Sequence, residues 1–239
     1  MKFFIDRKFR LPRVWSNREL EKFAHLFSGD IVNVSGWQDR DKGGRLYSGY
    51  FVNKNSYTIT NYRRGAIGVH VPQKEMFLDL EEPLPESLVN RFDVVFNHTV
   101  LEHVYRVHTA FRNLCLMTRD IVILVVPFLQ PMHVGSDYGD YWRFTPLAIR
   151  NAFKENGMSL LYLSFNGQKK ASVYIFAIAS KNPSKWLSKI HNEFSYTDSR
   201  KPLNGSAPCV GCHAIPNTRY FLYRLPKRIL RKLLSFLRR

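Results

Sequence analysis

FDVVFNHTVLEHV, residues 92–104, is the stretch that decides the fold of this 239-residue chain. Four of its first five residues are β-branched or aromatic, which predicts a short buried strand. Asn97 and His98 follow directly, at the point where that strand ends. Because open α/β sheets bind their ligands at the carboxyl ends of the strands, Asn97 is a candidate binding residue.

Similar strand patterns flank this stretch on both sides. Together they predict buried parallel strands at residues 31–34, 57–60, 76–78, 92–96 and 121–126. Helical patterns follow the last two strands, at 109–117 and 146–156. The runs 160–165 and 172–179 predict a closing antiparallel hairpin. This alternation predicts an α/β fold with a doubly wound, mostly parallel sheet.

Two helices carry signals at their ends. Ser16 and Glu19 have the spacing of a capping box, and the apolar residues that follow it, up to Gly29, predict an amphipathic helix. Thr145 is the expected N-cap of the helix after the fifth strand, and Gly157 is its expected stop.

These elements divide the chain into four parts. We expect an N-terminal segment and helix over 1–29, an α/β domain over 30–182, an irregular extension over 183–218 and a basic amphipathic tail over 219–239. The domain boundary is placed where Asn and Pro interrupt the strand pattern.

The composition favours an anionic partner. Lys and Arg outnumber Asp and Glu by 36 to 19, a formal net charge of +17, which suits nucleic acid, acidic lipid headgroups or acidic glycans. The three cysteines give no disulfide framework and charges interrupt the N-terminal apolar residues, so we expect a cytoplasmic protein. The longest strongly apolar run, 121–129, is far shorter than a membrane-spanning helix requires.

Four segments carry a resemblance to a known family. They are FLDLEEPLP (77–85), FDVVFNHTVLEHV (92–104), VVPF (125–128) and DYWRFTP (140–146). In this order and spacing they resemble class I methyltransferases that depend on S-adenosylmethionine, particularly a type 11-like branch associated with surface-polysaccharide biosynthesis. The resemblance implies a Rossmann-like fold, S-adenosylmethionine as cofactor, and methyl transfer to a glycan or glycolipid precursor.

The resemblance also implies roles for residues at the strand ends. Asp79, followed by Leu80, matches the carboxylate that accepts a hydrogen bond from the adenine amine. The alternative is that Asp79 is an acid at a helix N-terminus. Asn97 matches the position where the chain passes the methionine moiety, and a backbone contact is favoured there over a side-chain contact.

The loop after the first strand departs from the family pattern. Ser35 and Trp37 replace glycines, which leaves Gly36 alone, and Asn33 replaces an acid. Asn61 replaces the acid that normally holds the ribose hydroxyls, so a charge-assisted hydrogen bond becomes a neutral one. Weak cofactor binding, an altered cofactor pose and an inactive protein are all consistent with these changes.

Two histidines are candidates for a general base that would deprotonate a sugar hydroxyl. His103 lies in LEHV, where a backbone-bonded histidine at a helix start is an equal alternative. His133 lies in the long loop after the central strand, a kind of segment in which catalytic residues concentrate.

The same loop combines polar and aromatic side chains suited to a sugar, since aromatic faces stack on the ring and ionic groups bond its hydroxyls. The candidate substrate residues are Tyr138, Asp140, Tyr141 and Arg143. The alternative is structural: Trp142 locks the loop onto the core while Arg143 pairs with Asp140.

Cys209, Cys212 and His213 have the spacing of a c-type haem attachment motif. That chemistry needs an exported chain, and a zinc site would need a fourth ligand that the sequence does not supply. We therefore interpret the cysteines as ordinary thiols and predict no metal site.

The tail after Pro226 reads KRILRKLLSFLRR, with a leucine-rich helical face and cations elsewhere. From Lys227 to Arg239 this is typical of an interfacial helix on an anionic membrane. A groove on a partner protein is the main alternative, and no nucleic-acid partner is expected. The sequence leaves open an enzyme, a catalytically inactive scaffold that binds at the membrane, and, third, an RNA methyltransferase.

Overall fold

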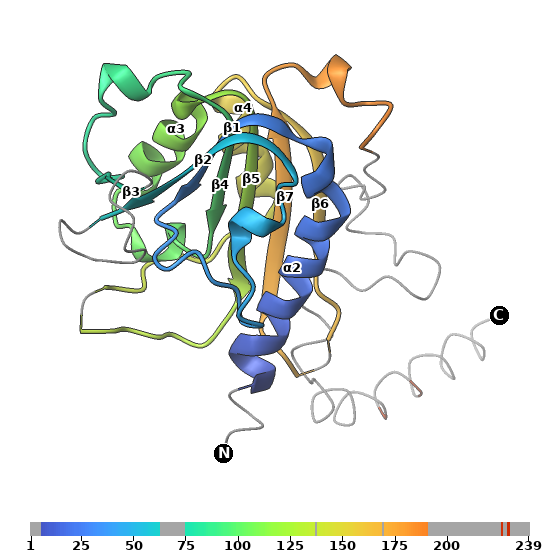
Figure 1. Cartoon of the computed structure of the whole chain (residues 1–239). Coiled ribbons are helices and arrows are strands. Elements are labelled where there is room, and N and C mark those ends of the chain that lie inside the picture. The colour runs from blue at the N-terminus through green and yellow to red at the C-terminus, as the bar shows by residue number, and fades with distance from the viewer. Residues whose placement is uncertain are drawn as a thin grey trace.

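The computed structural model describes residues 6–62, 75–136, 138–168 and 170–190, together with Pro226 and Ile229. Its centre is one seven-stranded sheet with the order β3-β2-β1-β4-β5-β7-β6 (Figure 1). The strands are β1 (Ser28–Val34), β2 (Asn53–Asn61), β3 (Glu75–Phe77), β4 (Phe92–His98), β5 (Thr118–Leu129), β6 (Ser159–Phe165) and β7 (Val173–Ser180). The first five are parallel, and β7 runs antiparallel between β5 and β6. The predicted doubly wound sheet with its C-terminal hairpin is confirmed.

Helices cover both faces of the sheet. Helix α2 (Leu11–Phe23) lies on one face, and α3 (Val107–Met117) and α4 (Pro146–Glu155) lie on the other (Figure 1). Short helical turns are found at Asp6–Arg10, Ala24–Leu26, Tyr47–Gly49, Glu86–Leu88, Leu101–His103 and Pro183–Lys185. The turn over Leu101–His103, labelled η6, directly follows β4.

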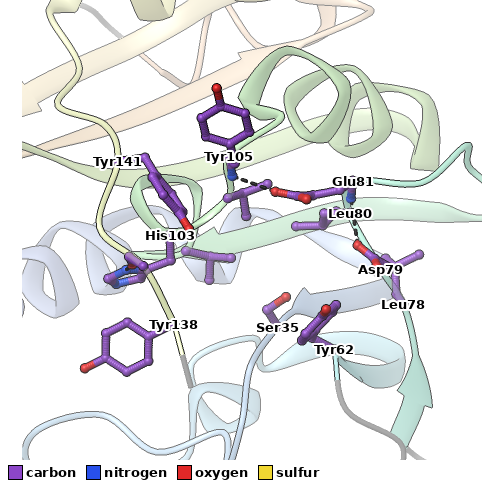
Figure 2. Close-up of a pocket in the computed structure, with 13 residues that line it drawn as sticks. Ser35, Tyr62, Leu78, Asp79, Leu80, Glu81, His103, Tyr105, Tyr138 and Tyr141 are labelled. Atoms are coloured by element: carbon purple, nitrogen blue, oxygen red, sulfur yellow. Dashed lines mark hydrogen bonds between the residues drawn. The ribbon is translucent and has the colours of Figure 1, made fainter. Parts of the chain in front are cut away.

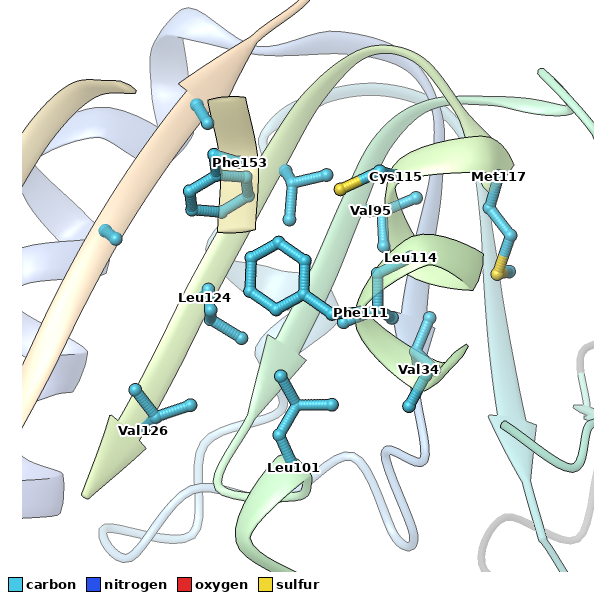
Figure 3. Close-up of a cluster of buried hydrophobic side chains, with 14 of the residues drawn as sticks. Val34, Val95, Leu101, Phe111, Leu114, Cys115, Met117, Leu124, Val126 and Phe153 are labelled. Atoms are coloured by element: carbon cyan, nitrogen blue, oxygen red, sulfur yellow. The ribbon is translucent and has the colours of Figure 1, made fainter. Parts of the chain in front are cut away.

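Strand β5 is apolar at every position from Ile121 to Leu129, after three polar residues at its start. Ile121 and Ile123 belong to the buried cluster on the α2 side of the sheet. Val122 and Leu124 belong to the cluster on the other side, which Phe111 of α3 and other residues complete (Figure 3). Successive side chains of a strand point to opposite faces, so a strand covered on both faces has no position left for a polar residue.

The start of the first helix differs from the sequence prediction. Ser16 lies inside α2, five residues after the helix begins, so the predicted capping box at Ser16 and Glu19 is wrong. Pro12 occupies the first turn instead, where its missing N–H leaves no hydrogen bond unmade. The carboxylate of Glu19 accepts a hydrogen bond from the Tyr162 hydroxyl of β6 at 2.7 Å. Ser16 and Glu19 thus bond residues distant in the chain, His98 and Tyr162, and do not cap a helix.

The structure shows two features of the C-terminal part of the domain, the ends of α4 and the packing of the residues that follow it. The side chain of Thr145 accepts the N–H of Ala148 at 3.1 Å, and Gly157 follows the helix with φ +71°, so both predicted end signals of α4 are confirmed. Trp186 and Ile190, beyond the predicted boundary at 182, are buried in the cluster on the α2 side. Residues up to 190 therefore pack on the domain core.

Several predicted features lie outside the described residues. They include Cys209, Cys212 and His213, and all of the tail from Lys227 to Arg239 except Ile229. Within the described ranges, no helix combines the length and the apolar character needed to cross a membrane.

Candidate functional site

Two adjoining cavities lie at the carboxyl edge of the sheet, where β1 has β2 on one side and β4 on the other. This is the switch point at which open α/β sheets bind ligands. The first, the aspartate cavity, has a volume of about 320 Å³, and its walls include Ser35, Asp79, Leu80, His103, Tyr138 and Tyr141 (Figure 2). The second, the cationic cavity, has about 390 Å³, and its walls include Arg13, Ser35, Trp37, Arg40, Lys42 and His98. Ser35 and Val100 belong to both.

The loop after β1 keeps a conformation that normally requires glycine. Ser35 and Trp37 have φ values of +55° and +48°, in the left-handed region. This region costs a residue with a Cβ about 1–2 kcal/mol. Gly36 is needed for another reason, because a Cβ there would lie 2.5 Å from the Asn33 amide nitrogen. The glycines that the family pattern expects are absent, but their backbone shape is retained, and such strain concentrates at functional sites.

Hydrogen bonds from β2 hold this loop in place. The side-chain oxygen of Asn61 accepts the N–H of Trp37 at 2.8 Å, and its amide donates to Glu75 at 2.5 Å. Thr60 accepts the N–H groups of Ser35 and Gly36, each at 3.1 Å. Asn61 therefore holds the loop in place. The resemblance also implies that it bonds the ribose hydroxyls, and it would have to do so while keeping the bonds to Trp37 and Glu75.

Asp79 lies half-buried in the wall of the aspartate cavity, next to Leu80. One of its oxygens accepts the N–H of Glu81 at 2.9 Å (Figure 2). Glu81 lies at the start of α3, where its carboxylate accepts the N–H groups of Tyr105 and Arg106, the two residues before the helix, at 2.6 and 3.1 Å. The helix-start alternative therefore applies to Glu81, and the carboxylate of Asp79 faces the cavity.

Asn97 is fully buried at the end of β4. Its amide donates to the carbonyl of Val34 at 3.1 Å, which ties β4 to β1. Its side-chain oxygen has no hydrogen-bond partner among the described residues. An unpartnered buried acceptor costs about 1–3 kcal/mol, so its presence beside the two cavities needs an explanation.

His103 has the geometry of a base. Its Nδ1 lies 2.6 Å from the carbonyl oxygen of Gly139. Because a carbonyl only accepts, Nδ1 carries the proton and donates, which leaves the lone pair on Nε2. Burial lowers the pKa of His103 below its usual 6.5, so the ring is neutral near pH 7. The neutral ring lines the aspartate cavity and packs edge-on against Tyr138, with ring centroids 4.6 Å apart (Figure 2).

His133 stands behind His103, with ring centroids 4.9 Å apart, and outside the walls of the two cavities. Its Nδ1 lies 3.2 Å from the carboxylate of Asp140. Of the two predicted bases, His103 is therefore the one that reaches a cavity.

The four candidate substrate residues divide into two pairs. Tyr138 and Tyr141 are half-exposed and line the aspartate cavity. The buried carboxylate of Asp140 accepts two hydrogen bonds from Arg143, at 2.5 and 2.7 Å. Burial raises the pKa of Asp140, but these bonds and the His133 N–H outweigh it and hold the pKa at about 2. The second pair favours the structural alternative, in which the ion pair braces the loop.

Sequence reasoning missed Glu102, which is buried beneath the site. Burial raises its pKa to about 8, so the carboxyl is uncharged near neutral pH, and one of its oxygens has no partner among the described residues. Its backbone oxygen accepts the N–H of Tyr141 at 2.7 Å, which fixes the loop over η6. No local pattern identifies such a residue, because its burial arises only when the loop folds back.

Sequence reasoning also missed the cations of the second cavity. Arg13 comes from α2 and Lys42 from the loop after β1, segments that only the tertiary fold brings together. Trp37, predicted as a cofactor residue, lines this cavity with 55% of its surface exposed.

No protein-family model matches this sequence, and no curated protein sequence matches it. Solved structures do match. An S-adenosylmethionine-dependent methyltransferase from Clostridium acetobutylicum aligns with a TM-score of 0.52 at 9% identity, covering 73% of this chain and 95% of its own. The 1,6-didemethyltoxoflavin-N1-methyltransferase of Burkholderia thailandensis, with bound S-adenosylhomocysteine, aligns with a TM-score of 0.50 at 14% identity, covering 75% and 86%. The chain therefore has the Rossmann-like fold of class I methyltransferases.

Proposed function

We propose that this protein is an S-adenosylmethionine-dependent methyltransferase whose cofactor occupies the aspartate cavity. The observation that carries the proposal is the Asp79 carboxylate in the wall of a cavity at the switch point of a methyltransferase fold. When bound, the cofactor supplies an electrophilic methyl group on a sulfonium.

The residues present fit this cofactor. Asp79 is placed to accept a hydrogen bond from the adenine amine, and Leu80 gives the cavity an apolar surface. The left-handed backbone at Ser35 presents main-chain groups to both cavities. Asn97 is fully buried and lines neither cavity, so it contributes by tying β4 to β1 through the carbonyl of Val34.

We further propose that the acceptor is a hydroxyl of a glycan or glycolipid precursor. His103 carries its lone pair on Nε2 and would accept the proton of the acceptor hydroxyl there. Tyr138 and Tyr141 offer aromatic faces beside this histidine for a sugar ring.

Asp79→Ala tests cofactor binding. We expect S-adenosylhomocysteine to bind the wild type and the variant to bind it at least about tenfold more weakly, because a charge-assisted hydrogen bond is lost. Titration calorimetry measures both, and Glu82→Ala, which removes an exposed neighbouring acid, is the matched control. Equal affinity of the Asp79 and Glu82 variants would place the adenine elsewhere.

Two observations favour a second candidate, a catalytically inactive methyltransferase-like scaffold. Asn61 is engaged by Trp37 and Glu75, and Ser35 stands where the family has glycine. No heat from wild-type protein at millimolar S-adenosylhomocysteine would support the scaffold against the enzyme.

The membrane setting is proposed from the tail alone. We place the protein in the cytoplasm, peripheral at the inner face of the cytoplasmic membrane, held there by Lys227 to Arg239. The full chain should sediment with anionic but not neutral vesicles and be released at 1 M salt, where the Debye length is about 3 Å. Truncation before Leu225 should abolish sedimentation and keep cofactor binding. Equal sedimentation of the truncated protein would contradict the anchor.

A further inference from the structure

The loop between β5 and α4 is held by an ion pair whose acid is completely covered. The side chain of Asp140 has no exposed surface, although the residues on either side of it are half-buried or exposed. Its oxygens accept the guanidinium of Arg143 at 2.5 and 2.7 Å, and one of them also accepts the N–H of His133 at 2.8 Å. Such paired, charge-assisted bonds fix the geometry of both partners. Arg143 also donates to the carbonyl oxygens of Gln130, at 3.2 Å, and Trp142, at 2.7 Å, so the ion pair joins both ends of the loop.

The peptide bond before Asp140 carries the carbonyl to which His103 donates. This carbonyl, of Gly139, lies 2.6 Å from Nδ1 of His103, so the place of Asp140 sets the place of the acceptor. In a neutral imidazole, the hydrogen bond made by one nitrogen decides which of the two carries the proton. Moving the carbonyl by about 1 Å would take it out of hydrogen-bond range and free the ring to adopt the other tautomer. In that tautomer Nε2 holds the proton and cannot act as a base.

The carbonyl of Gly139 is the partner that selects the tautomer among the described residues, because Oε1 of Glu102 lies 3.9 Å from Nε2 of His103, too far for a hydrogen bond. Burial has the largest influence on the pKa of His103 and lowers it, whereas the Gly139 bond and the charge of Asp140 raise it. The charged or titratable groups around the ring are Arg13, Glu102, His133, Tyr138 and Asp140. Asp140 therefore acts on His103 by its charge as well as through the backbone.

We infer that Asp140 is a positioning residue: paired with Arg143, it holds the Gly139 carbonyl where that carbonyl fixes His103 in the tautomer that a base requires. The importance of this tautomer for methyl transfer rests on the proposed function, in which His103 accepts the acceptor proton. The tautomer itself is a property of the free protein and can be measured without any substrate. Replacing a residue that only stabilised the loop would lower the free energy of unfolding and leave the tautomer of His103 as it is.

Nitrogen NMR of the full chain labelled with ¹⁵N-histidine is the test, and His103→Gln identifies the signals of His103. We expect the wild-type ring, at a pH where it is neutral, to carry its proton on Nδ1. Asp140→Asn keeps the size of the side chain and removes its charge. It should lower the ratio of Nδ1–H to Nε2–H tautomer at least about fivefold and lower the pKa of His103. Asp30→Asn, near the start of β1, is the matched control and should change neither.

A wild-type ring with its proton on Nε2 would overturn the inference, and so would equal tautomer ratios in the Asp140 and Asp30 variants. If Asp140→Asn does not fold, Arg143→Lys takes its place, since lysine keeps the positive charge and loses the paired bonds. It should lower the ratio about twofold or more. An unchanged ratio in that variant would equally overturn the inference.

Calorimetry with S-adenosylhomocysteine separates this outcome from failure of the proposed function. If the wild type binds S-adenosylhomocysteine and the tautomer of His103 does not depend on Asp140, the positioning role fails and the cofactor site stands. If the tautomer depends on Asp140 and the wild type does not bind S-adenosylhomocysteine, the positioning of His103 stands and the methyltransferase proposal fails.

Discussion

Among the described residues, polar side chains have partners within the protein at one end of the central sheet, and several of them lack such partners at the other end. At the amino end, Arg119 donates hydrogen bonds to Asp93, both at 2.8 Å, and to Asp30 at 3.1 Å. Asp120 next to it accepts the indole N–H of Trp186 at 3.0 Å and is also bonded to Ser180. The charges at this end are used within the protein.

At the carboxyl end, several groups lack such partners within the described part of the chain. Arg13 has no carboxylate, and Asn97 and Glu102 each keep an unpartnered buried oxygen. Both ends belong to one sheet and one core, so stability alone does not explain the difference. The end with unpartnered polar groups is the end at which parallel sheets bind ligands. We therefore expect substitutions at the carboxyl end to change binding and substitutions at the amino end to change stability.

The largest effect should follow from removing the base at the carboxyl end. We expect His103→Gln to lower kcat at least about 100-fold, since general base catalysis contributes that much or more. Affinity for S-adenosylhomocysteine and melting temperature should stay near wild type. Because burial lowers the pKa of His103 below 6.5, wild-type kcat/KM should be lost only as pH falls below 6.5. His133→Gln is the control, and an equal loss there would move the base to His133.

The next effect lies at the amino end and concerns stability. Asp120→Ala leaves the hydroxyl of Ser180 and the indole N–H of Trp186 without their acceptor, while the N–H of Asn182 keeps its bond to Ser180. This should cost about 2–4 kcal/mol in the free energy of unfolding. Urea denaturation measures the loss. Cofactor affinity of the folded variant should be unchanged, and Asp120→Asn, which keeps one oxygen, should lose less. A tenfold fall in affinity would show that the two ends are coupled.

Replacing Glu102 at the carboxyl end should raise the free energy of unfolding, by less than Asp120→Ala lowers it. Burial raises its pKa from 4.5 to about 8, so the folded protein holds a proton that the unfolded chain releases, and stability falls as pH rises through this window. Glu102→Gln should remove this loss and gain about 1–3 kcal/mol at pH 8, and little at pH 4.5. Denaturation at both pH values is the measurement. A gain independent of pH would mean that ionisation is not the cause.

The same comparison explains how far the sequence predicts this protein. The strands were predictable because β-branched runs buried on both faces leave a local signature, as at β5. Asp79 was predictable as a cavity residue because it lies just past the carboxyl end of β3, two residues after Phe77. Arg13, Lys42 and Glu102 were not, because their roles depend on segments distant in the chain meeting at the carboxyl edge. A helix pattern gives no indication that Arg13 faces a cavity, and the misplaced start at Ser16 put it outside the predicted helix.

The smallest effect should come from Arg119, although it donates three hydrogen bonds to carboxylates. Its side chain is 41% exposed, and those of Asp30 and Asp93 are 30% and 36% exposed, so water screens the pairs. We expect Arg119→Ala to cost less than about 1 kcal/mol at pH 7, and less still in 1 M salt. The Ser56 hydroxyl and Arg119 lower the pKa of Asp30, and Arg119 lowers that of Asp93. Their stabilisation is therefore present above the unfolded pKa of about 3.9 and lost as pH falls through the lower folded values. The difference between wild type and variant should then vanish in acid, and a difference that persists at pH 2 would show that the arginine acts through packing of its stem instead of its charge.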